Sequence, residues 1–278
     1  ALALRERLRD GGDVVVVGAG WIGLEVAAAA RAHGCAVTVV EPRPAPLEAV
    51  MGTHIGGWFA RWHGSHGVEF RLGTGVASFA GEDAVTGVVT SAGETLPARV
   101  VVVGVGIRPR TELAEAAGAD VDDGVLTDAA LRTSLDGVWA AGDVARWRSS
   151  LLGGPVRVEH WANAHDGGFA AGRSMAGARV AYDPVPFFFS DQYEAGLEYA
   201  GHVPRGTDAE LVLRGDEAAP EFMAFWVVSE GSGVRVLAGL HVNVWGTMDA
   251  VQRLIRARTV VAADRLADPS VPLDDLAG

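Results

Sequence analysis

The chain has 278 residues, of which 49% are hydrophobic and 21% charged, enough for two ordinary domains with well-filled cores. Its formal net charge of −12 argues against nucleic acid as a partner, because binding a phosphate backbone needs a concentrated basic face. Because no apolar run approaches the length of a membrane span, we expect neither a membrane partner nor a signal peptide. Cys35 stands alone and cannot form an internal disulfide, so we expect a reducing, cytoplasmic setting.

The first nine residues predict a charged helix that ends at Asp10-Gly11-Gly12. The helix starts without a capping residue, which suggests that the chain was cut from something longer. Four valines, Val14–Val17, then predict a strand buried on both faces, as in a parallel sheet.

A G-x-G-x-x-G motif follows the valine strand directly, as Gly18-Ala19-Gly20-Trp21-Ile22-Gly23. An Ala-rich helix to about Arg31 and a second strand over residues 36–40 come next, and the strand ends at Glu41. The spacing from the glycines to this acid matches a dinucleotide-binding fingerprint. The alternative is a tight turn in an α/β domain that binds no ligand. The presence of a strand, a loop, a helix, a second strand and a terminal acid in one continuous unit argues against this alternative.

Each part of the fingerprint has a physical role. Gly18 permits the tight turn, Gly20 lets the backbone approach a pyrophosphate, and Gly23 lets the helix lie close to the strand. The helix N-terminus offers backbone N–H groups to the phosphates. Glu41 would accept hydrogen bonds from a ribose and repel a 2′-phosphate, which favours NAD over NADP, although Arg43 leaves the choice open.

The elements that follow complete a dinucleotide-binding domain, which we expect over residues 10–107. Val100–Val103 predicts another strand buried on both faces, and it leads into Gly104 and Gly106. The other expected elements are a helix over 49–67, strands over 68–71 and 76–79, and a hairpin over 84–90 and 94–96.

Two further regions are expected, over residues 108–183 and 184–278. The first contains a short helix over 111–117, a hairpin-like segment over 121–127, a strand from Val138 into Gly142-Asp143, and a helix over 162–175. The second contains strands over 222–228, 234–237 and 240–242 and a terminal helix over 248–258. Antiparallel strands followed by a helix predict a separate α+β domain.

Four segments together resemble the FAD-dependent, NADH-utilising ferredoxin reductases of oxygenase systems, within the pyridine nucleotide-disulfide oxidoreductase superfamily. They are the fingerprint with Leu24-Glu25, residues 133–144, residues 159–164 (EHWANA) and residues 188–193 (FFSDQY). The resemblance implies an α/β fold with a Rossmann-like NAD-binding domain, a partial FAD-binding domain and a C-terminal interface domain. The family's first Gly-rich loop, which binds the ADP half of FAD, has no counterpart here, so the front of the FAD domain is expected to be absent.

The resemblance also implies roles for individual residues. It puts Glu25 near the nicotinamide amide, with a solvated helix glutamate as the alternative, and it adds Gly106 to the NAD-binding residues. Gly142 and Asp143 would contact the ribityl or phosphate part of FAD, unless this is a plain turn. His160 and Trp161 would lie near the flavin ring, with a core aromatic as the alternative for Trp161. No acid–base residue is expected, because hydride transfer needs none.

The implied activity is hydride transfer from NADH to FAD, followed by single-electron transfer to a [2Fe-2S] ferredoxin. Four arginines near the flavin motifs are candidates to bind an acidic ferredoxin: Arg146, Arg148, Arg157 and Arg173. For each of them, a solvated surface position without a partner is an equal alternative. With one Gly-rich loop, we expect the chain to bind NAD but to hold FAD weakly.

Other interpretations remain open at this stage. One is a pyridine nucleotide-disulfide reductase or an NADH oxidase of the same superfamily, and another is an NAD-binding fragment that is inactive by itself. No metal-ligand pattern is present, and the scattered histidines carry no weight as ligands: His33, His54, His63, His66, His165, His202 and His241.

Overall fold

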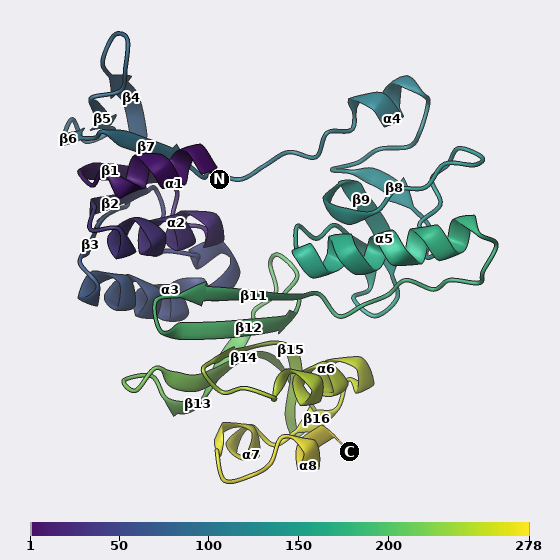
Figure 1. Ribbon diagram of the computed structural model, residues 1–278. Helices are drawn as coiled ribbons and strands as arrows, with labels where there is room; N and C mark the ends of the chain where they lie inside the picture. Colours follow the sequence, from purple (N-terminus) through teal and green to yellow (C-terminus); the bar gives the residue numbers. More distant parts are fainter. Residues whose placement is uncertain (1, 278) are drawn as a thin grey trace. The chain divides into compact units, whose positions relative to one another are not determined.

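The computed structural model describes residues 2–277 (Figure 1). The chain divides into two compact units. The first unit contains residues up to Ile107 together with Ser190–Glu194. The second contains Arg108–Phe189 and the residues from Ala195 onward. No helix within residues 2–277 has both the length and the apolar character needed to cross a membrane.

A four-stranded parallel sheet forms the centre of the first unit, in the order β3-β2-β1-β7. The expected parallel sheet and the expected strand–loop–helix–strand order are confirmed. The elements of this part are α1 (Leu2–Arg9), β1 (Asp13–Val17), α2 (Trp21–Ala32), β2 (Ala36–Glu41), α3 (Glu48–Ser65), β3 (Val68–Leu72) and β7 (Val100–Val103).

The valines of β1 are buried on both faces of the sheet, as their β-branched run predicts. Val15 and Val17 belong to a core cluster with Val88 and Leu96, which come from an antiparallel meander. The meander strands are β4 (Val76–Ala80), β5 (Gly87–Thr90) and β6 (Thr95–Pro97). The opposite face of β1 meets α2, where a Cβ added at Gly23 would lie 3.4 Å from a methyl group of Val16.

Strand β7 corrects one expectation from the sequence. Its four valines predict burial on both faces, but they are only partly buried and Val103 is 55% exposed. The strand lies at the edge of the sheet and pairs with β1 alone. An apolar run shows that a strand can be buried on both faces, but whether it is buried depends on the elements that flank it.

The second unit begins with a small sheet, β10-β9-β8, next to a long helix. Its core contains Trp147, Val158 and Tyr182. The elements are α4 (Glu112–Ala116), β8 (Val125–Thr127), the 3₁₀ turn η1 (Gly142–Val144), β9 (Ala145–Ser149), β10 (Gly154–Val156) and α5 (Trp161–Met175).

The expected strand from Val138 into Gly142-Asp143 is wrong. Within this stretch Trp139 forms only an isolated bridge with Arg132, residues 142–144 form the 3₁₀ turn, and the strand starts at Ala145. A strand needs a continuous ladder of backbone partners, and the described residues give this segment a single paired position.

The C-terminal part is a largely antiparallel sheet in the order β11-β12-β15-β14-β13, with β16 paired to β15. The helix expected over residues 248–258 is confirmed as α6, with Val251 and Leu254 buried. Gly239 allows this close approach, since a Cβ there would lie 2.8 Å from Val251. The elements are β11 (Phe187–Gln192), β12 (Ala195–Gly201), β13 (Glu210–Asp216), β14 (Glu221–Glu230), β15 (Gly233–Val242), α6 (Met248–Ala257), β16 (Val260–Val261), α7 (Ala263–Ala267) and α8 (Asp274–Ala277).

Two details of this part differ from the sequence analysis. The segments expected as separate strands over 234–237 and 240–242 are one continuous strand, β15. Helix α6 is followed by β16, α7 and α8, so it is not the last element. The α/β class, with a Rossmann-like parallel sheet and a C-terminal antiparallel sheet, is confirmed.

Candidate nucleotide-binding sites

The three fingerprint glycines meet different surroundings. A Cβ at Gly18, whose φ is +98°, would lie 2.4 Å from the carbonyl oxygen of Gly104. A Cβ at Gly23 would lie 2.1 Å from the carbonyl oxygen of Gly18. A Cβ at Gly20 would meet nothing within 4 Å. Two glycines therefore close the loop onto the sheet, while the third exposes bare backbone to open space.

Helix α2 begins immediately behind this bare backbone. Gly20 is its N-cap, in an extended conformation, and no side chain caps the helix there. The ring of Trp21 packs edge-on against Phe59 of α3 at 5.6 Å, whereas Ile22 is 65% exposed. An uncapped helix start beside an open glycine is an arrangement that can bind an anion through backbone N–H groups.

Glu41 is fixed beside the loop by two backbone donors. The N–H of Ala19 donates to Oε2 at 2.8 Å, and the N–H of Arg43 donates to Oε1 at 3.0 Å. Each carboxylate oxygen keeps a further lone pair, so the side chain can still accept hydrogen bonds from hydroxyl groups. The guanidinium of Arg43 forms an ion pair with Glu48 at 2.7 Å.

Glu25 lies one turn into α2, and its side chain is exposed. The hydroxyl of Ser190 donates a hydrogen bond to its Oε1 at 2.5 Å. Gly106 lies in the exposed loop after β7 with φ +96°. That loop starts close to the fingerprint, because the N–H of Gly104 donates to the carbonyl oxygen of Val17 at 2.8 Å.

In the second unit the Gly142-Asp143 turn packs on α5. Gly142 is buried with φ +74°, and a Cβ there would lie 3.4 Å from the Cβ of Ala164. The side chain of Asp143 is exposed, yet partial burial raises the pKa of its carboxyl group, and the nearby charge of Glu159 raises it further. The turn thus packs on α5 through Gly142 and leaves the Asp143 carboxylate exposed near Glu159.

The start of α5 presents two aromatic residues in different states. His160 is the N-cap; burial lowers its pKa to about 4, and its buried Nδ1 has no hydrogen-bond partner within residues 2–277. Trp161 is 69% exposed and stacks on His165 at 4.9 Å. Asn163 fixes this turn, since its Nδ2 donates to the carbonyl of Val158 at 2.8 Å and its Oδ1 accepts from Tyr182 at 2.8 Å.

The four candidate arginines fall into two groups. Arg146 pairs with Asp122 at 2.6 Å, and Arg157 pairs with Asp123 at 3.3 Å and with Glu159 at 2.6 Å. Arg148 on β9 and Arg173 on α5 are exposed. The side chains of Arg146 and Arg157 are therefore engaged in ion pairs within the unit, whereas those of Arg148 and Arg173 are exposed to solvent.

Three polar residues that the sequence analysis gave no role join the first site. Ser190 and Gln192 lie two apart on β11, so their side chains share one face of the strand, and both are buried. His63 of α3 is fully buried and contacts Gln192 at 2.7 Å. The available signal was the run of three polar residues, Ser190 to Gln192, directly after the aromatic run of Phe187 to Phe189.

Neither a thiol nor a metal site stands out in the described part of the chain. Cys35 is fully buried, burial raises the pKa of its thiol, and its Sγ lies 3.4 Å from the carbonyl oxygen of Leu8. These contacts give Cys35 the environment of a small packing residue. Residues 2–277 contain no group of three or more His, Cys, Asp or Glu side chains able to hold a metal ion.

A Gly-rich loop on a parallel sheet, followed by a Gly-Asp turn packed on a helix and an antiparallel C-terminal sheet, is typical of two-dinucleotide flavoproteins. The chain belongs to the pyridine nucleotide-disulphide oxidoreductase family, whose model matches residues 1–168. A second model, described as reductase C-terminal, matches residues 187–277.

Curated relatives cover nearly the whole chain. It is 40% identical over 276 residues to the ferredoxin–NAD(+) reductase component of the anthranilate 1,2-dioxygenase system of Burkholderia cepacia, covering 98% of this chain and 66% of the relative. It is 35% identical over 279 residues to putidaredoxin reductase of Pseudomonas putida, covering 99% of this chain and 65% of the relative. The chain thus spans slightly less than two thirds of the length of these relatives.

Solved structures give the same family. A ferredoxin reductase from Rhodopseudomonas palustris matches with a TM-score of 0.91 and 36% identity, over 100% of this chain and 67% of that one. The covalent putidaredoxin reductase–putidaredoxin complex matches with a TM-score of 0.89 and 35% identity, over 98% of this chain and 64% of that one. The resemblance drawn from the sequence motifs is confirmed.

Proposed function

We propose that this chain is the NADH-binding and C-terminal part of a FAD-dependent ferredoxin–NAD(+) reductase that serves an oxygenase. The relatives that match over nearly all of the chain carry this activity in their names. The observation that carries the proposal is the loop at Gly20, where open backbone, an uncapped helix start and a fixed carboxylate meet. Together these groups suit the pyrophosphate and ribose of a dinucleotide.

The first site fits NAD(H) better than NADP(H). The backbone from Gly18 to Gly23 would bind the pyrophosphate, and Glu41 would accept hydrogen bonds from the adenosine ribose. The ion pair with Glu48 holds the Arg43 guanidinium, which is therefore less able to bind a 2′-phosphate. A carboxylate at Glu41 with an occupied Arg43 favours the cofactor that lacks this phosphate.

Glu25 would meet the nicotinamide end of the same cofactor. Its exposed carboxylate is an acceptor, which suits the N–H groups of a carboxamide. Gly106, in the loop after β7, would border the same end with its bare backbone. These roles orient the cofactor and need no proton transfer by a side chain.

The second site fits part of a FAD molecule. Gly142 and Asp143 would bind its ribityl or phosphate groups, and the start of α5 at His160 and Trp161 would meet the flavin ring. The exposed ring of Trp161 is suited to stack on a bound aromatic group. When bound, the two cofactors supply the redox chemistry, with a hydride passing from NADH to FAD and single electrons leaving for the ferredoxin.

We further propose a [2Fe-2S] ferredoxin as the electron acceptor, with Arg148 and Arg173 as its contacts among the four candidate arginines. Their exposure supports this choice, whereas Arg146 and Arg157 are neutralised by acidic neighbours. The free, buried Cys35 supports a reducing, cytoplasmic setting.

Two measurements on the purified chain test the proposal. Calorimetric titration should give tight binding of NADH, weaker binding of NADPH, and none of either in a Gly20→Asp variant, whose carboxylate would repel the pyrophosphate. After addition of FAD, ferricyanide and an iron–sulfur ferredoxin should both be reduced by NADH, while a disulfide substrate should not. A chain that fails to bind NADH would refute the proposal.

The visible spectrum of the purified chain tests cofactor retention separately. Because the chain holds one Gly-rich loop, we expect little flavin absorbance without added FAD. A stoichiometric yellow flavin band in the protein as purified would contradict the expected weak binding.

A further inference from the structure

An unbroken series of hydrogen bonds runs from α3 through β11 to Glu25, all within the first unit. His63 Nε2 lies 2.7 Å from Gln192 Oε1, and Gln192 Nε2 donates to Ser190 Oγ at 3.1 Å. Ser190 Oγ then donates to Glu25 Oε1 at 2.5 Å. At the far end, the hydroxyl of Tyr193 lies 3.4 Å from His63 Nδ1.

The donor and acceptor groups of these side chains make all the hydrogen bonds of the series point the same way. Gln192 presents its oxygen to the imidazole, so the Nε2 of His63 must carry the proton and donate. The Nδ1 of the same ring is then an acceptor for the Tyr193 hydroxyl. The amide nitrogen of Gln192 and the hydroxyl of Ser190 continue the order. Every bond therefore donates toward the Glu25 carboxylate, which is the final acceptor.

Burial makes this order rigid. His63 and Gln192 have no exposed surface, and Ser190 is 3% exposed, so water does not compete for their hydrogen bonds. Burial also lowers the pKa of His63 to about 4, which keeps the imidazole neutral near pH 7 and able both to donate and to accept.

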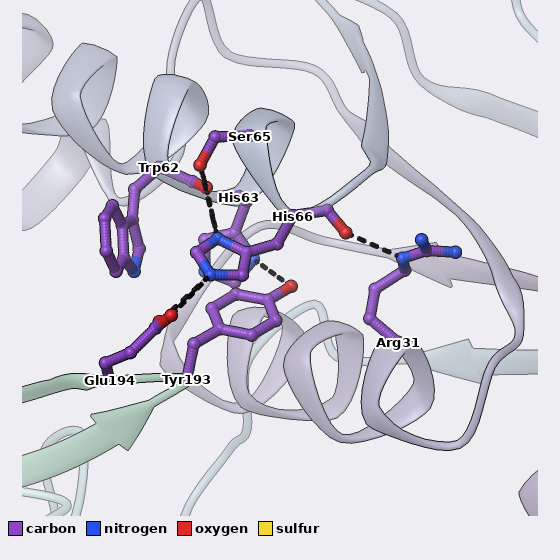
Figure 2. Close-up of polar contacts among 7 residues, drawn as sticks. All are labelled: Arg31, Trp62, His63, Ser65, His66, Tyr193 and Glu194. Atoms are coloured by element: carbon purple, nitrogen blue, oxygen red, sulfur yellow. Dashed lines mark hydrogen bonds and ion pairs between the residues drawn. The ribbon is translucent and has the colours of Figure 1, made fainter.

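Figure 2 shows how the far end is held. The ring of Tyr193 stacks on the imidazole of His66 at 3.8 Å, and His66 contacts the carboxylate of Glu194 at 3.0 Å. Arg31 of α2 donates to the backbone carbonyl of His66 at 2.8 Å, so the end of α3 is tied to α2 as well. The series thus joins α3 and β11 to the helix that carries Glu25.

The series of hydrogen bonds restrains one carboxylate oxygen, Oε1, of the exposed Glu25 side chain. Oε1 of Glu25 accepts from Ser190, while Oε2 has no hydrogen-bond partner within residues 2–277. An exposed glutamate on a helix otherwise samples several rotamers, and fixing one on ligand binding costs conformational entropy. A side chain already held by a buried donor avoids most of that cost.

We propose that Ser190, Gln192, His63 and Tyr193 are positioning residues that hold the Glu25 side chain in one orientation, so that Oε2 accepts a hydrogen bond from the carboxamide of nicotinamide. This rests on the proposed NADH site. The arrangement selects a dinucleotide that ends in a neutral amide donor, and it disfavours one that ends in a carboxylate, because two carboxylates repel each other.

The test compares ligands that differ only at the nicotinamide end. Binding of NADH and of ADP-ribose, which lacks nicotinamide, is measured by calorimetry on the full chain. Ser190→Ala should weaken NADH binding about fivefold through loss of the donor to Glu25 and leave ADP-ribose binding unchanged. Ser190→Thr, which keeps the hydroxyl, should restore most of the NADH affinity.

The matched control is Asp191→Asn, on the same strand and with an exposed side chain. It should change neither affinity. A second measurement combines Ser190→Ala with Glu25→Gln: if serine acts through Glu25, its substitution should cost no further NADH affinity in the Glu25→Gln background.

The outcomes separate this inference from the proposed function. Equal weakening of NADH and ADP-ribose by Ser190→Ala, or full additivity with Glu25→Gln, would mean a structural role and overturn the positioning role while the NADH site stands. A wild-type chain that binds neither ligand would refute the NADH site, and the positioning role with it.

Discussion

The two candidate nucleotide-binding regions of this protein differ in how completely their polar groups are engaged. In the first, Glu41 and Glu25 are held by backbone and side-chain donors of the same unit. In the second, Trp161 is 69% exposed and the buried Nδ1 of His160 has no partner within the described residues. The first region is therefore organised before a ligand arrives, whereas the second has groups still to be satisfied. We expect NAD affinity to be a property of the chain alone and FAD affinity to be low.

The largest expected effect comes from closing the first loop. In Gly23→Ala the new Cβ would lie 2.1 Å from the carbonyl oxygen of Gly18, and backbone cannot yield as a flexible side chain does. We expect a loss of at least about 3 kcal/mol in the free energy of unfolding. Urea unfolding measures it, and the first unit should melt first.

Gly20→Ala is the matched control for Gly23→Ala. Its Cβ would meet nothing within 4 Å, so we expect a change in unfolding free energy of about 1 kcal/mol or less, from the poorer N-cap, together with weaker NAD binding. If both variants unfolded alike, the different roles given to these two glycines would be wrong.

Acid should destabilise the chain through a histidine in each unit. Burial lowers the pKa of His63 and of His160 to about 4, from an ordinary value of 6.5. In the unfolded chain both take up a proton near pH 6.5, so the stability due to the neutral folded form is present above that pH and is lost as pH falls toward 4. For fully buried His63 the loss reaches about 3 kcal/mol at most.

Unfolding measured between pH 7 and pH 4 checks this sign. His63→Gln replaces the imidazole with an amide that can donate a hydrogen bond but does not titrate, so it should flatten the pH dependence of the first unit. His160→Gln should do the same for the second unit. If stability rose as the pH fell, or if neither substitution changed the slope, the histidines would not be the acid-sensitive groups.

The sequence was sufficient wherever local patterns decide structure. The valines of β1, the glycine motif and Glu41 predicted the fold of the first unit, because strand period, turn chemistry and helix start lie within one continuous segment. The burial of Val100–Val103 was mispredicted, since it depends on which strands flank β7. The link from His63 to Gln192 joins residues separated by 129 positions, which no local pattern reports. Long-range polar contacts are therefore the part of the site that required the structure.

A smaller effect is expected at Glu41. Removing its carboxylate in Glu41→Ala takes away the acceptor for the Ala19 and Arg43 N–H groups and for a ribose hydroxyl, which should weaken NAD binding about tenfold. The same change removes repulsion toward a 2′-phosphate, so NADP binding should weaken less or improve. Calorimetry with both nucleotides measures the ratio. A loss shared equally by NAD and NADP would contradict the proposed preference.

The smallest effects should fall on binding of the proposed ferredoxin partner, for which the two groups of arginines give opposite expectations. Charge reversal at exposed Arg148 or Arg173 should weaken binding of an acidic ferredoxin by about fivefold at low salt and by little at high salt, because exposed charges are screened. Arg146→Glu instead breaks the pair with Asp122, so it should lower the unfolding temperature more than the ferredoxin affinity. Titration of ferredoxin at two ionic strengths, with thermal unfolding of each variant, separates the two groups. If Arg146→Glu alone weakened binding without loss of stability, the ferredoxin would contact the paired arginines rather than the exposed ones.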